Sequence, residues 1–167
     1  MIRLVERKDT KSIDDILETF ASSMEAIAMA LDGLKGILLL NKDWNLKEGQ
    51  NEFIKQFDQT KNRILLCLMN MEASLAWLRS YCIDEKPPYN IGKKGLDAIA
   101  KWTKTAGIHL ALYKRKTMNS TAPQLIDEEK RLRRNIDELN ILLISINVAN
   151  KSVKGPTYPL IQNPFKK

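Results

Sequence analysis

The chain has 167 residues, enough for one domain with a hydrophobic core and too few for two domains of ordinary size. Hydrophobic residues make up 44% of the sequence and charged residues 28%, a globular composition that excludes an intrinsically disordered chain. The net charge of +7 favours an anionic partner, such as nucleic acid, an anionic membrane surface or an acidic protein surface.

The first predicted helix begins after Ser12, whose side chain can cap its N-terminus, and extends to about Leu40. Gly33 and Gly36 weaken its C-terminal end, and the polar stretch 41–50 predicts the first connection. Apolar residues recur along this helix at intervals of three and four, which is helical spacing. They are Ile13, Ile16, Leu17, Phe20, Met24, Ile27, Leu31, Leu34 and Leu38.

The second predicted helix runs for roughly thirty residues without glycine or proline, a length that is common in helical bundles. Pro87 and Pro88 then end it, because they lack amide donors and exclude helical geometry just before them. Its apolar stripe comprises Phe53, Phe57, Ile64, Leu68, Met71, Leu75, Leu78 and Cys82.

The two cysteines, Cys67 and Cys82, lie in this one helix at a separation of roughly 22 Å, whereas a disulfide needs Cα atoms within about 7 Å. We therefore expect free thiols in a reducing compartment, the cytoplasm or the nucleus. The N-terminus lacks the apolar run of a signal peptide. The most apolar stretch, 37–40, is far shorter than the roughly 20 residues that span a bilayer. The sequence thus predicts an intracellular protein that is neither secreted nor transmembrane.

The third predicted helix runs from Lys93 to about Met118 and carries most of the excess positive charge. Trp102 lies on its apolar side, and most of the cations gather on the opposite side with a single acid, Asp97. Cations at helical spacing can contact several phosphates, so we predict nucleic-acid binding with little sequence selectivity. The predicted binding residues are Lys93, Lys94, Lys101, Lys104, Lys114, Arg115 and Lys116.

Three aromatic residues near these cations, Tyr89, Trp102 and Tyr113, could stack on bases if they are exposed. The alternative is that the aromatic residues belong to the core and that the lysines form an ordinary solvated face of a surface helix. An anionic membrane surface is a less favoured partner for the same cations.

The fourth predicted helix follows Pro123, and the acidic residues at 127–129 fall in its first turns, where the helix dipole favours them. Its apolar residues alternate at spacings of four and three, like the seam of a coiled coil. This helix is therefore central in the bundle or lies at a subunit interface. The seam residues predicted to bind a protein partner or a second copy are Leu132, Ile136, Leu139 and Leu143.

From Gly155 onward the chain contains several prolines and is predicted to be extended. Its apolar residues allow two interpretations. They either strap across the surface of the bundle itself or dock on a partner as a short, proline-stiffened peptide. These residues are Tyr158, Leu160, Ile161 and Phe165.

The sequence shows no recognisable catalytic or metal-binding motif. His109 is the only histidine, and we expect it to have a structural or solvent-exposed role. One histidine and two distant cysteines cannot supply the clustered ligands of a zinc site, and no glycine-rich loop precedes a helix as phosphate cradles require. We therefore predict a protein without enzymatic activity, metal, cofactor or small-molecule substrate.

Together these features predict an all-α fold, an antiparallel up-down-up-down four-helix bundle with an extended C-terminal tail. Residues 1–150 form the bundle domain, and 151–167 form a basic, proline-containing tail. The predicted function is nucleic-acid binding through the third helix. The alternative is a protein-interaction or assembly module, such as a viral or phage accessory or structural protein, in which the fourth-helix seam and the tail carry the contacts.

Overall fold

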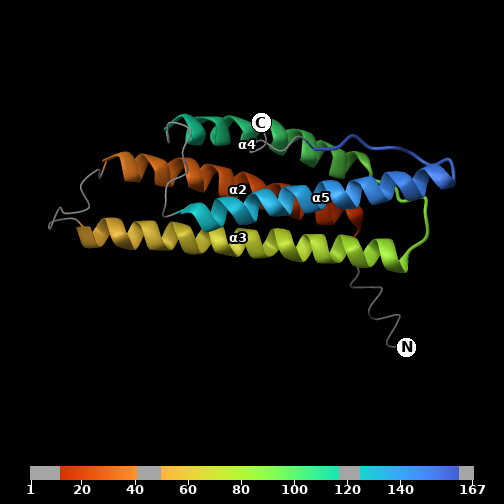
Figure 1. Cartoon of the computed structure of the whole chain (residues 1–167), viewed down its shortest axis with the longest axis horizontal. Coiled ribbons are helices and arrows are strands. Elements are labelled where there is room, and N and C mark those ends of the chain that lie inside the picture. Colours follow the sequence, from red (N-terminus) through yellow and green to blue (C-terminus); the bar gives the residue numbers. More distant parts are fainter. Residues whose placement is uncertain (1–11, 41–49, 117–124, 162–167) are drawn as a thin grey trace, which may run out of the picture.

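A computed structural model describes the backbone of residues 12–40, 50–116 and 125–161, and the side chains of 12–34, 55–112 and 125–161. It contains four helices, α2 (Ile13–Leu40), α3 (Gln50–Asp84), α4 (Lys93–Lys116) and α5 (Ile126–Ser152), followed by an extended segment (Figure 1). These described ranges contain no β-strand. The predicted all-α bundle with an extended tail is confirmed.

Each helix runs antiparallel to the one before it, but the side-by-side neighbours include parallel pairs. Helix α2 packs against both α3 and α4, and α3 also packs against α5. Asp14 contacts the loop before α4, and Asp32 contacts His109 farther along it, so α2 and α4 run in the same direction. Among the described helices, α3 and α4 do not pack together, because α2 lies between them (Figure 1). The hydrophobic periodicity predicts which face of a helix is buried, and it does not specify this order of neighbours.

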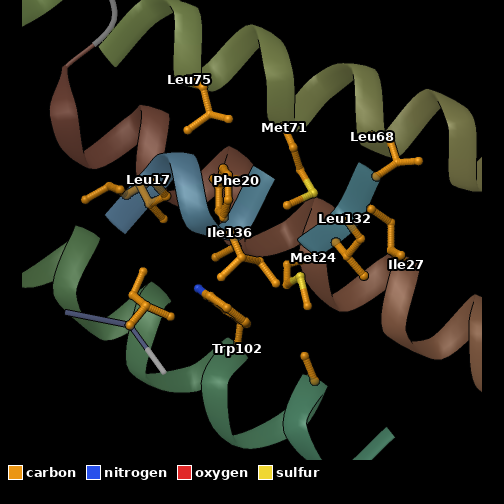
Figure 2. Packing of buried hydrophobic residues seen from close by; sticks show 14 of the residues in the cluster. Leu17, Phe20, Met24, Ile27, Leu68, Met71, Leu75, Trp102, Leu132 and Ile136 are labelled. Atoms are coloured by element: carbon orange, nitrogen blue, oxygen red, sulfur yellow. The ribbon is translucent and has the colours of Figure 1, made fainter. Parts of the chain in front are cut away.

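The core lies where the apolar stripes of all four helices meet (Figure 2). Phe20 of α2 packs against Trp102 of α4 with their ring centroids 6.5 Å apart, while Met71 of α3 and Ile136 of α5 point into the same interior. The predicted stripes of the first, second and fourth helices are buried wherever their side chains are described, apart from Cys82, which is half-buried. Burial of this apolar surface is the main stabilising contribution to the fold.

Ion pairs tie the parallel neighbours α3 and α5 together along their length. The Arg131 guanidinium donates to both carboxylate oxygens of Glu72, at 2.6 and 2.5 Å, and Asn135 donates to the same carboxylate. The hydrogen bond from Arg131 is the main cause that lowers the pKa of Glu72 below its ordinary value, and the hydrogen bond from Asn135 lowers this pKa further. Farther along both helices, Arg79 contacts Glu138 at 2.9 Å. The bidentate geometry fixes the register of the two helices.

Candidate functional site

The predicted cationic face of α4 is only partly available to a ligand. Lys93, Lys101 and Lys104 are exposed. Lys94 is exposed as well, but its ammonium lies 3.2 Å from Glu18 and 3.8 Å from Asp15 of α2. The hydrogen bond to Glu18 raises the pKa of Lys94. The side chains of Lys114, Arg115 and Lys116 lie outside the described residues.

A groove of about 380 Å³ between α2 and α4 is lined by two of these lysines, Lys94 and Lys101. Its ionisable lining comprises three carboxylates and two ammonium groups, from Glu18, Glu25, Asp97, Lys94 and Lys101. The charge along this side of α4 is therefore mixed, whereas a phosphate-binding face is expected to be predominantly positive.

Two of the three aromatic residues considered for base stacking belong to the core. Trp102 is fully buried against Phe20, and Tyr89 is buried with its hydroxyl donating to the carbonyls of Cys82 and Glu85. Neither ring presents a free face to a base, so the stacking interpretation is wrong for both. The side chain of Tyr113 lies outside the described residues.

His109 has an acid partner that the sequence did not reveal. Its Nδ1 lies 3.2 Å from Asp32 Oδ2, and this contact joins α4 to α2. Both side chains are half-buried. Within the described residues no three His, Cys, Asp or Glu side chains converge as a metal site requires.

The predicted partner-binding seam of α5 lies inside the bundle. Its four residues are fully buried as part of the chain's own core, so in this structure they do not form a surface that a partner could reach. These residues are Leu132, Ile136, Leu139 and Leu143.

The apolar residues of the tail are divided between the bundle and the solvent. Tyr158 and Ile161 are buried against the bundle, and the backbone of both residues bonds to asparagines of α5. Leu160 is exposed, and Phe165 lies outside the described residues. The described part of the tail, up to Ile161, thus straps across its own bundle, as the first of the two interpretations states.

The outer face of α3 carries an exposed apolar row that the sequence-based predictions missed. Leu66, Met69 and Trp77 are 60%, 55% and 38% exposed, and Ala73 between them is also exposed. At 100° per residue, Leu66, Ala73 and Trp77 fall within roughly 40° of one another, whereas the core residue Leu75 lies on the opposite side of the helix. We call Leu66, Met69, Ala73 and Trp77 the outer stripe. Helix α3 is thus apolar on two opposite sides, and the spacing of these residues in the sequence already contained that signal.

A shorter apolar row lies on the outer face of α5. Ile141, Ile144 and Val148 are each about half exposed or more. Together with the outer stripe of α3, they leave much apolar surface open to solvent. A single exposed apolar residue is ordinary, but a row of them marks an interaction surface.

Among the described residues, none of the helices is both long enough and apolar enough to cross a bilayer. Comparisons with protein-family models, with curated proteins and with solved structures give no match for the chain.

Proposed function

We propose that the chain is a protein-interaction module that self-associates through the outer stripe of α3, as a two-fold dimer with the two α3 helices antiparallel. The observation that carries the proposal is the row of large apolar side chains exposed on the side of α3 opposite the core. Covering this row on association removes apolar surface from water, which is the main driving force for most protein association.

The small residue at the middle of the outer stripe suits a two-fold axis. Ala73 lies midway between Met69 and Trp77, and its short side chain allows two helices to approach closely there. An antiparallel pair centred on Ala73 brings Met69 of one copy level with Trp77 of the second along the helix axis, so large apolar side chains flank the small residue on both sides.

Charged residues at the two ends of the outer stripe favour the same orientation. Exposed Arg63 lies ten residues before Ala73, and exposed Asp84 lies eleven residues after it. An antiparallel pair centred on Ala73 therefore brings Arg63 of one copy level with Asp84 of the other, to within about 1.5 Å along the helix axis.

The two charges also lie on the same edge of the outer stripe. At 100° per residue, Arg63 falls about 80° and Asp84 about 20° from Ala73, both in the same rotational sense. A two-fold axis perpendicular to the helices brings this edge of one copy against the same edge of the second, so the long Arg63 side chain can reach the carboxylate. In a parallel pair the two opposite charges would lie roughly 31 Å apart along the axis, and their attraction would be lost.

Charge exchange tests the orientation. We expect Arg63→Glu alone to weaken the dimer by about tenfold, because it replaces two symmetry-related attractive contacts by repulsive ones. The double variant Arg63→Glu/Asp84→Arg restores opposite charges and is expected to return the dissociation constant to within about threefold of the original. Sedimentation equilibrium over a concentration series measures both constants.

Lys104→Glu, an equal charge reversal at an exposed position of α4, is the matched control and is expected to leave the dimer intact. A double variant that associates as weakly as the single variant contradicts the antiparallel arrangement. A wild-type chain that stays monomeric at every accessible concentration contradicts the dimer itself.

A second candidate function is polyanion binding by α4, which the exposure of Lys93, Lys101 and Lys104 favours. If this face binds nucleic acid, affinity falls steeply with salt as counterions are released. Lys101→Glu/Lys104→Glu is then expected to weaken binding about equally for every sequence tested. A gel-shift series in increasing salt measures this, and absent or salt-insensitive binding rejects the candidate.

A further inference from the structure

Helix α5 holds the C-terminal segment through asparagine side chains that bind its main chain. Asn147 Oδ1 accepts from the Tyr158 amide at 2.8 Å, and its Nδ2 donates to the Tyr158 carbonyl at 2.8 Å. Asn140 makes the same pair of hydrogen bonds to Ile161, at 2.8 and 2.6 Å. We call Asn140 and Asn147 the asparagine clamp.

The spacing of the clamp matches an extended chain. Seven residues of α-helix rise about 10.5 Å, and three residues of extended backbone advance about 10 Å. Asn147 and Asn140 are therefore in register with Tyr158 and Ile161 of a segment that runs back along α5 (Figure 1). Because both asparagines bind only backbone groups of this segment, the geometry suits any extended peptide and does not depend on its sequence.

Two buried side chains add sequence selectivity to the clamp. Tyr158 and Ile161 are buried, whereas Pro159 and Leu160 between them are exposed. The Tyr158 hydroxyl accepts a hydrogen bond from the Ile91 amide, in the loop before α4, at 2.8 Å. Proteins that recognise an extended peptide usually gain affinity from hydrogen bonds to its main chain. They gain specificity from pockets that accept particular side chains.

We propose that the groove formed by the asparagine clamp and the loop at 89–91 is a binding site for an extended segment of a partner protein, with a tyrosine followed three residues later by an aliphatic residue. The chain's own segment, 156–161, occupies this site and competes with the partner. The site does not include the outer stripe of α3, and the proposal does not depend on self-association.

The connection between α5 and the segment permits such an exchange. Lys154 has a φ of 57°, and the amides of Lys154 and Gly155 bond to the carbonyls of Lys151 and Asn150, so this turn is the C-terminal cap of α5. None of these bonds involves residues 158–161, so the segment can leave the clamp while the cap stays in place. The short connection also gives the tethered segment an effective concentration in the millimolar range. A partner peptide therefore competes at millimolar concentration, and at lower concentration only when the tethered segment is weakened or the partner binds more tightly.

A peptide-binding experiment on the full chain tests the proposal. The probe is a fluorescent peptide with the sequence of residues 155–163, and the protein carries Tyr158→Ala, which empties the tyrosine pocket while keeping the clamp. We expect this variant to bind the probe at least about tenfold more tightly than the wild type, measured by fluorescence anisotropy.

Two controls test the parts of the site. Adding Asn140→Ala/Asn147→Ala to the variant is expected to abolish the gain in affinity. A probe with alanine in place of its tyrosine is expected not to bind. A folded Tyr158→Ala variant that binds the probe no better than the wild type overturns the proposal.

If circular dichroism shows that Tyr158→Ala unfolds, the wild-type chain provides the test through hydrogen exchange. Millimolar unlabelled peptide is expected to speed amide exchange at Tyr158 and Ile161, because the displaced segment loses its bonds to the clamp. A peptide of the same composition in scrambled order is the control. Unchanged exchange at both amides in the presence of the matching peptide overturns the proposal.

Discussion

Replacing Asn150 by alanine is expected to lower the free energy of unfolding by about 3 kcal/mol. The side chain is fully buried, and its Oδ1 accepts from the Tyr89 amide at 2.6 Å. Its Nδ2 donates to the carbonyls of Tyr89 and Pro156, each at 2.8 Å. Alanine would leave the amide and the carbonyl of Tyr89 buried without these partners, which costs more than the lost bonds contribute. Urea denaturation followed by far-ultraviolet circular dichroism measures the change.

Asn147→Ala is the matched comparison, because it also removes a pair of main-chain hydrogen bonds from α5. Asn147 is only half-buried, so water can reach the groups it leaves, and we expect a loss of about 1 kcal/mol. If the two substitutions destabilise the chain equally, Asn150 does not hold the loop before α4 and the tail to the end of α5.

Replacing Ala73 by arginine is expected to weaken the α3 dimer by at least about 100-fold, equivalent to about 2.7 kcal/mol. At the two-fold axis, one substitution brings two guanidinium groups together and removes both from water. Ala73 is exposed in the single chain, so we expect its unfolding midpoint to change little. Sedimentation velocity over a concentration series measures the association.

Ala100→Arg makes the same chemical change at an exposed alanine of α4. We expect it to leave the dissociation constant within about twofold of the wild-type value, since α4 lies away from the proposed interface. Equal effects at positions 73 and 100 would show that added charge, and not the location of the outer stripe, determines the result.

Helical periodicity was sufficient to predict the four helices and most of the core. A residue such as Phe20 or Leu68 is buried because the spacing of its stripe puts it on the inner face, and spacing is a local property of the sequence. The seam of α5 shows the limit of this reasoning. A heptad seam indicates that Leu132 and Ile136 meet another helix, but it does not indicate whether that helix belongs to the same chain.

The surfaces depend on contacts between distant parts of the sequence and were less predictable. Lys94 belongs to a cationic run in the sequence, yet the carboxylates of Asp15 and Glu18 on α2 lie beside it in the fold. The asparagines of α5 have no distinguishing feature in the sequence, because their role depends on the tail that lies against them. The outer stripe of α3 was the exception, because Leu66, Met69 and Trp77 already formed a second helical row in the sequence.

Oxidative cross-linking of Ala73→Cys tests self-association through the outer stripe most directly. Residues at the two-fold axis of an antiparallel pair lie close enough for a disulfide, which requires Cα atoms within about 7 Å. We predict that mild oxidation of the full chain yields a covalent dimer on a non-reducing gel, whereas Ala100→Cys yields no more dimer than the wild type with its own Cys67 and Cys82. A substituted chain that remains monomeric on oxidation, or that cross-links no faster than Ala100→Cys, would contradict the proposed interface.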